Sequence, residues 1–108
     1  MTVNRLAERL QLEKLCIPDG DREIDGAYAG DLLSWVMGRA KPGNCWATIM
    51  TNVNTLAVAS LLDLSCIIFC ENSELSADII NAAEAKEINL LRTGMSEYEL
   101  CVALGAAI

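Results

Sequence analysis

Two short apolar runs flank an apolar, helix-forming segment in the middle of the chain, and this pattern constrains the fold more than any other feature. The runs at residues 45–50 and 66–70 are rich in β-branched and aromatic residues, which is typical of buried strands. Residues 51–54 are of the types that form turns and helix caps, and residues 55–64 are rich in Ala and Leu. A strand, a helix and a strand joined by short turns form a right-handed crossover, so this segment predicts a parallel sheet.

The alternation of helices and strands continues on both sides of this segment. The other predicted elements are a helix over 2–15 capped by Thr2, a short strand over 15–17, a helix over 32–39, a helix over 75–87, a strand over 88–91, and a final helix that begins with a capping box of Ser96 and Glu99. We therefore predict one α/β domain over residues 1–108. It is a small three-layer domain whose mainly parallel sheet of about four to five strands is covered by helices on both faces.

The chain has more apolar residues than a domain of its size needs for a core. Hydrophobic residues make up 53% of the 108 residues, whereas aromatic residues make up only 5%. The surplus favours a contact with a partner, most simply a second copy of the chain. Trp35, Met37 and Trp46 are the predicted interface residues, and a place in the core is the alternative for both tryptophans.

Charge and hydropathy argue against two classes of partner. The formal net charge is -7 and the 8 Lys and Arg residues are scattered, whereas a nucleic-acid-binding protein needs a clustered basic surface. No apolar run is long enough to span a membrane, and the first residues lack the apolar segment of a signal peptide. We therefore expect a cytoplasmic protein with neither a nucleic-acid nor a membrane partner.

The residues that usually carry catalysis or bind metals are scarce. The chain contains no histidine, no phosphate-binding Lys loop, no nucleophile elbow and no zinc-ligand pattern. Its five cysteines form no Cys-x-x-Cys pair, and all but Cys16 lie in apolar surroundings, so we expect buried, reduced thiols. These observations predict a protein that is not an enzyme and that holds no cofactor or metal.

Polar residues gather where the predicted strands end. Ligands of open α/β sheets bind beyond the carboxyl ends of the strands, so these residues predict a site for a small polar ligand. The candidate ligand-binding residues are Asp25, Gly26, Tyr28, Asp31, Thr51, Asn52, Asn54 and Thr93. Structural roles remain alternatives: Asn52 and Asn54 as turn or cap residues, Asp31 as the cap of the following helix, and Gly26 for backbone geometry.

Several of these segments together resemble the DRTGG domain family. They are the run Asp-Gly-Ala-Tyr-Ala-Gly-Asp-Leu-Leu-Ser at 25–34, Trp-x-Thr-Ile at 46–49, Thr-Asn-Val-Asn at 51–54 and Ala-Val-Ala-Ser at 57–60. The resemblance extends from about residue 3 to residue 104. The chain departs from the family pattern at two places: Asp25 stands at the first position of a Thr-Gly-Gly-Tyr string, and Asn52 stands at the His of a Thr-His-x-Asn string.

The resemblance implies a small α/β fold and a homodimeric regulatory or scaffolding module without chemistry of its own. Similar domains occur in regulated inorganic pyrophosphatases, next to CBS domains that sense adenine nucleotides, and a related fold forms the non-catalytic N-terminal part of HPr kinase. We therefore expect a homodimeric regulatory module that binds a small polar ligand, with an adenine nucleotide as the candidate. The alternative is a protein-interaction or scaffold module with no ligand of its own.

Overall fold

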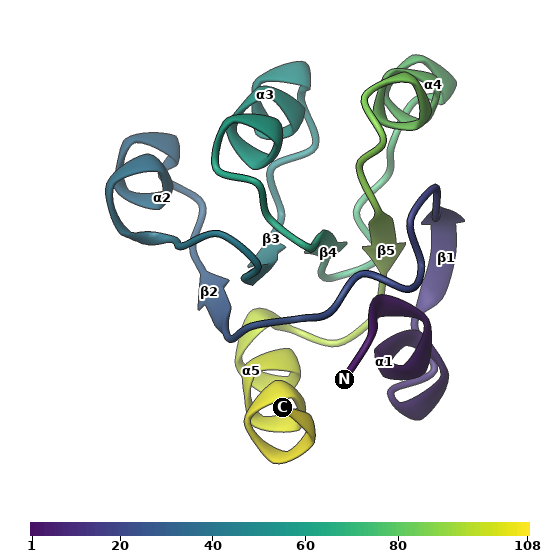
Figure 1. Cartoon of the computed structure of the whole chain (residues 1–108), viewed down its shortest axis with the longest axis vertical. Helices are drawn as coiled ribbons and strands as arrows, with labels where there is room; N and C mark the ends of the chain where they lie inside the picture. Colours follow the sequence, from purple (N-terminus) through teal and green to yellow (C-terminus); the bar gives the residue numbers. More distant parts are fainter.

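A computed structural model describes residues 1–108 and contains five helices and five strands. In chain order they are α1 (Val3–Arg9), β1 (Glu13–Cys16), β2 (Ala27–Ala29), α2 (Leu33–Arg39), β3 (Cys45–Thr48), α3 (Val53–Leu61), β4 (Cys66–Phe69), α4 (Ala77–Ala85), β5 (Leu90–Arg92) and α5 (Glu97–Ala107). The strands form one sheet in the order β1-β5-β4-β3-β2. Helices α2, α3 and α4 cover one face of this sheet, and α1 and α5 cover the other (Figure 1).

The predicted fold class is confirmed, since the structure is a three-layer α/β fold with a mainly parallel sheet. β2, β3, β4 and β5 run parallel to their neighbours, and only β1 runs antiparallel, against β5. The first predicted helix is too long: α1 ends at Arg9, and Gln11 adopts a left-handed backbone conformation that turns the chain into β1. The Thr2 cap and the Ser96–Glu99 capping box are both present.

Strands β3 and β4 are buried on both faces, as expected for the centre of a covered parallel sheet. Alternate side chains point to opposite layers. Cys45 and Ala47 pack with α1 and α5, whereas Trp46 packs with α2, α3 and α4. The core therefore consists of two apolar clusters, one on each face of the sheet.

The prediction of which cysteine is not buried is wrong. Cys16 is buried, and its thiol donates to Glu84 Oε2 at 3.0 Å, whereas Cys101 is the exposed cysteine. Cys101 lies on the flank of α5 that is turned toward β2 and remains exposed there, which its apolar sequence neighbours did not indicate. All five cysteines are free thiols. No helix has both the length and the apolar character needed to cross a membrane.

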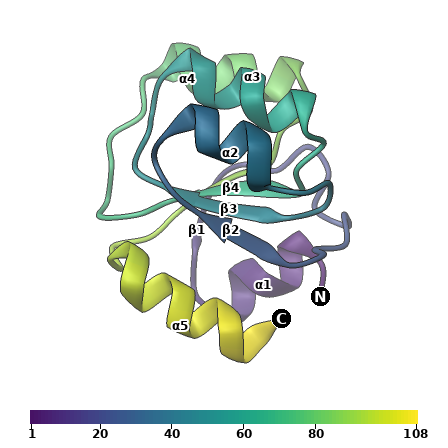
Figure 2. The same cartoon turned by 90° about the vertical axis from the view of Figure 1, so that its left-hand side faces the viewer.

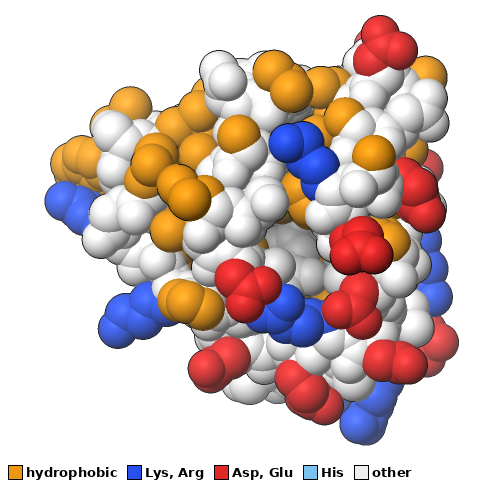
Figure 3. Space-filling model, turned by 45° about the horizontal axis from the view of Figure 1, so that its top comes forward, with side chains coloured by type: hydrophobic (Ala, Val, Ile, Leu, Met, Phe, Trp, Pro, Cys, Tyr) orange, Lys and Arg blue, Asp and Glu red, His pale blue; other side chains and the backbone are white.

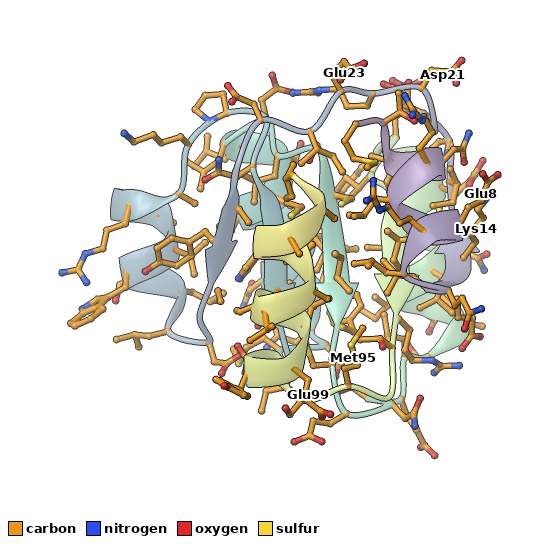
Figure 4. The ribbon with its side chains drawn as sticks, turned by 90° about the horizontal axis from the view of Figure 1, so that it is seen from below. Glu8, Lys14, Asp21, Glu23, Met95 and Glu99 are labelled. Atoms are coloured by element: carbon orange, nitrogen blue, oxygen red, sulfur yellow. The ribbon has the colours of Figure 1, made fainter.

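Acidic and apolar side chains occupy different parts of the surface. Apolar side chains gather on the α2 side of the molecule, while Asp and Glu side chains gather toward α4 and β1 (Figure 3). Seen from the α5 face, Glu8 and Lys14 lie at α1 and β1, with Asp21 and Glu23 on the loop beyond them (Figure 4). The side formed by β2 therefore faces away from most of the charge.

Candidate functional site

The four parallel strands end at the same edge of the sheet, which we call the carboxyl edge. The loops that form it follow Ala29 of β2, Thr48 of β3, Phe69 of β4 and Arg92 of β5. In Figure 2 these loops lie on the left, where α5 also begins. The strand order brings together polar groups that are far apart in the sequence, as the sequence analysis predicted for this edge.

Asp31 joins the first two of these loops. Its Oδ1 atom accepts hydrogen bonds from the Thr48 hydroxyl at 2.8 Å and from the Ile49 amide at 2.9 Å. Asp31 is therefore not the cap of α2, because the cap position is Leu32 and makes no side-chain hydrogen bond. The Asp31 carboxyl group fastens the end of β2 to the end of β3, a contact between residues that are 17 positions apart.

Glu97, the first residue of α5, lies within hydrogen-bonding reach of Asp31. Burial, the hydrogen bond to Asp31 and the negative charges of Asp31 and Glu71 raise the pKa of Glu97 to about 7. Burial alone would raise the pKa of Asp31 as well, but hydrogen bonds from Ile49, Thr48 and Glu97 lower it below its usual value. As the pH falls, Glu97 therefore takes up a proton before Asp31 does.

The loops after β4 and β5 are tied to each other by their backbones. The Glu71 amide donates to the Met95 carbonyl at 2.9 Å, and the Asn72 amide donates to the Thr93 carbonyl at 2.9 Å. Glu71 and Asn72 both have positive φ angles, 59° and 51°, so this loop holds two consecutive residues in the left-handed region. The predicted site residue Thr93 is used internally, because its hydroxyl accepts from the Met95 amide.

The turn after β3 carries three predicted site residues with different surroundings. Asn52 is the cap of α3, and its Oδ1 atom accepts from the amides of Asn54 and Thr55 at 2.9 and 3.3 Å. Asn54 is exposed and its side chain makes no hydrogen bond within the chain, while Thr51 is half-buried beside it. Asn54 is therefore the side chain of this turn with the most freedom to bind a ligand.

Two predicted site residues lie at the opposite edge of the sheet. Asp25 and Gly26 precede β2, which begins only at Ala27, so they stand at the amino ends of the strands. The Asp25 amide donates to the Gly43 carbonyl at 2.8 Å, and the Gly26 carbonyl accepts from the Cys45 amide at 3.0 Å. These bonds pair the segment with the start of β3, and the prediction that Asp25 and Gly26 join the other site residues is wrong.

Tyr28 lies in the middle of β2, away from both edges. It is half-buried and packs against the apolar cluster beneath α2, α3 and α4. Tyr28 is therefore close to Asp31 in the sequence, but it does not belong to the site at the carboxyl edge.

The three predicted interface residues have three different places. Trp46 is 0% exposed and its indole Nε1 donates to the Gly30 carbonyl at 2.9 Å, so its prediction as an interface residue is wrong and the core alternative holds. Trp35 is 54% exposed, with the Arg39 guanidinium 3.6 Å above its ring. Met37 is exposed as well. Val36 faces the sheet, and Trp35 and Met37 precede and follow it in the helix, so Trp35 and Met37 lie on opposite flanks of α2.

An apolar groove between β2 and α5 was not predicted from the sequence. It has a volume of about 350 Å³ and is lined by Gly26, Ala27, Tyr28, Ala29, Cys101, Leu104, Gly105 and Ile108. None of these residues is charged. The signal in the sequence is the series of small and apolar residues at helical spacing in 101–108. It is hard to recognise because α5 is apolar nearly all round, so that no single apolar face stands out.

The carboxyl edge is suited to ligand groups that donate hydrogen bonds rather than to anionic ligand groups. Asp31, Glu71 and Glu97 place negative charge there, and the nearest cation, Arg92, is paired with Glu13 at 2.9 Å. The amino ends of α3 and α5 are already capped by Asn52 and by Ser96. No three His, Cys, Asp or Glu side chains come together as metal ligands. The edge can therefore bind N–H and O–H groups, and Ile49 and Val53, both exposed, add apolar contact area.

The chain matches no known protein family by sequence, and no curated protein resembles it significantly. Its fold is similar to a crystal structure of the CBS and DRTGG domains of the regulatory region of Clostridium perfringens pyrophosphatase, in complex with the activator diadenosine tetraphosphate. The TM-score is 0.67 at 14% sequence identity, over 91% of this chain. The match covers 43% of the pyrophosphatase chain, so this chain spans less than half of that regulatory region.

Proposed function

We propose that this chain is a non-catalytic regulatory module that works as a homodimer and binds a small polar ligand at its carboxyl edge. The observation that carries the proposal is the convergence of the loops after β2, β3, β4 and β5 at one edge of the sheet, where Asp31 and Glu97 meet and Asn54 is exposed. Support comes from the shared fold, because the similar structure belongs to a regulatory region that binds a nucleotide activator. The DRTGG-like character of the chain is part of the same proposal.

The candidate ligand is an adenine nucleotide recognised through its nucleoside part. Carboxylate and amide oxygens accept hydrogen bonds from the exocyclic amino group and the ribose hydroxyls, and an exposed Val53 or Ile49 can pack on the flat base. The phosphates find no free cation here, and the amino ends of α3 and α5 are capped, so they extend toward solvent; only α2, a helix of seven residues, begins at this edge without a side-chain cap. We therefore expect adenosine to retain most of the affinity of its phosphorylated forms.

The exposed apolar side of the molecule favours the second candidate, a module whose only role is to bind protein. Leu32, Trp35 and Tyr98 are more than half exposed, which a monomer has no reason to maintain together. Both candidate functions include a homodimer, and they differ only in whether the protein binds a small ligand. A direct test of the carboxyl edge therefore separates them.

Replacing Asn54 by Ala tests the ligand site. The Asn54 side chain makes no hydrogen bond within the chain, so N54A leaves the free energy of unfolding within about 0.5 kcal/mol of the wild type. If Asn54 binds the ligand, the dissociation constant for adenosine or diadenosine tetraphosphate rises by roughly tenfold, the value of one hydrogen bond. Calorimetric titration measures the affinity, and urea unfolding measures the stability.

Two further variants serve as controls for this experiment. N81A removes the same side chain from an exposed position on α4, so the affinity stays unchanged. N52A removes the cap of α3 and lowers the free energy of unfolding by about 1 kcal/mol whether or not a ligand binds. Absence of binding by any adenine compound to the wild-type protein would exclude the ligand and leave the protein-interaction candidate.

A further inference from the structure

One side of the molecule combines an open sheet edge with two apolar helix flanks, and we call it the β2 side. It consists of β2, the flank of α2 that carries Leu32 and Trp35, and the flank of α5 that carries Tyr98, Cys101, Gly105 and Ile108. Figure 2 shows this side, with α2 above β2 and α5 below it. Met37 is absent from it, because it lies on the flank of α2 that faces α3.

The backbone of β2 offers hydrogen-bonding groups to a partner. On its inner side, β2 pairs with β3 through alternate residues, as the Gly26 carbonyl and the Gly30 amide show. The amides and carbonyls of Ala27 and Ala29 therefore point toward the open edge. No charged side chain, proline or bulge blocks that edge, although these are the usual protections of an exposed strand.

We propose that a second copy of the chain pairs with this edge through antiparallel β2 strands, on a two-fold axis at Tyr28. This inference rests on the proposed homodimer and supplies its geometry. With Tyr28 opposite its own copy, Ala27 of each chain lies opposite Ala29 of the other, and each such pair exchanges two hydrogen bonds. The two five-stranded sheets then form one continuous sheet.

The same operation covers both helix flanks. Because α2 and α5 both run antiparallel to β2, each packs beside its own copy, and Trp35 lies near the two-fold axis because it is near the middle of α2. Leu32, Trp35, Tyr98 and Ile108 are 58%, 54%, 78% and 43% exposed. At about 200 Å² for each side chain these fractions amount to roughly 450 Å², more than half of the ~800 Å² that each partner gives to a stable interface.

Charge also favours a second copy arranged in this way. Asp31 and Glu97 lie at the carboxyl end of the β2 side, and Arg39 and Lys41 lie with Asp25 at its amino end. A two-fold axis at Tyr28 brings the carboxyl end of one copy to the amino end of the other, so two cations meet the carboxyl pair. An extended peptide bound in the groove between β2 and α5 would leave Trp35 uncovered.

The test compares two variants on opposite flanks of α2 by analytical ultracentrifugation. W35E places two carboxylates near the two-fold axis, so the dissociation constant of the dimer rises at least about thirtyfold, as for a central interface residue. M37E adds the same charge on the flank that faces α3 and changes the dissociation constant by less than about threefold. Circular dichroism verifies that both variants are folded.

Amide hydrogen exchange of the wild-type protein gives an answer that needs no variant. In the dimer the amides of Ala27 and Ala29 are protected, so their exchange slows at least about tenfold between concentrations below and above the dissociation constant. A dimer that W35E leaves intact, with fast exchange at Ala27 and Ala29, overturns this geometry but not the proposed dimeric function. A wild-type protein that sediments at the 11.7 kDa of one chain at every concentration overturns both.

Discussion

Replacing Trp46 by Ala is expected to lower the free energy of unfolding by about 4 kcal/mol, the largest single effect in this chain. Trp46 is fully buried between the sheet and the α2–α4 layer, and removing its ring leaves a cavity that the surrounding strands cannot fill. The Gly30 carbonyl also loses its donor. Since small domains are stable by only about 5–15 kcal/mol, W46A is expected to be partly unfolded at 37 °C.

Urea unfolding followed by circular dichroism measures this loss, and Trp35 provides the matched control. W35A removes the same side chain from an exposed position, and at protein concentrations below the dissociation constant of the dimer it loses mainly its stacking with Arg39, so it costs about 1 kcal/mol or less. A W46A variant as stable as W35A would show that Trp46 is not a core residue. The pair of variants thus also separates the core role of one tryptophan from the interface role of the other.

The pH dependence of stability is expected to report the carboxyl pair at the carboxyl edge. Glu97 has a pKa of about 7 in the folded chain and the ordinary value of 4.5 when it is unfolded, so the folded state binds more protons between these values. Its contribution to stability is fully present below pH 4.5 and is lost as the pH rises through 7. For Asp31, whose pKa is lowered, the contribution is present at neutral pH and is lost in acid.

The expected loss between pH 5.5 and pH 8.5 is roughly 1 kcal/mol, because solvent screening at this half-buried site reduces the ~2 kcal/mol that the full shift in pKa would give. Urea unfolding at the two pH values measures it. E97Q cannot ionise, so its stability at pH 8.5 exceeds that of the wild type and its difference between the two pH values is smaller. E8Q, on the exposed face of α1, retains the wild-type pH dependence. A wild-type protein equally stable at both pH values would contradict the raised pKa of Glu97.

The fold could be predicted because its signals are local. The apolar runs of β3 and β4 and the helix between them follow from residue types in short windows, and the Ser96–Glu99 box fixes the start of α5. The short strands at the rim of the sheet have weaker local signals in the sequence. β2 consists of Ala27, Tyr28 and Ala29, which have little strand propensity as a group, and the strand forms because β3 offers a parallel neighbour.

The site could be predicted only as far as strand direction determines it. Asp31 and the turn at Asn52 follow parallel strands and meet at one edge, as expected, whereas Asp25 and Gly26 were expected to follow a strand but precede β2, which begins at Ala27. The Asp31–Glu97 contact joins β2 to α5 and depends on α5 crossing beneath the sheet to β2, which no local pattern encodes. The groove was missed for the same reason, since its two walls come from residues 26–29 and 101–108.

The most direct test of the proposed function is a titration of the ¹⁵N-labelled protein with diadenosine tetraphosphate, followed by amide chemical shifts. If the carboxyl edge is the ligand site, the shifts are confined to the loops after β2, β3, β4 and β5, with the largest changes at Asp31, Asn54 and Glu97. Adenosine is expected to move the same amides in the same directions. No change at any concentration, or changes confined to the amino edge around Asp25 and Gly26, would contradict the proposal.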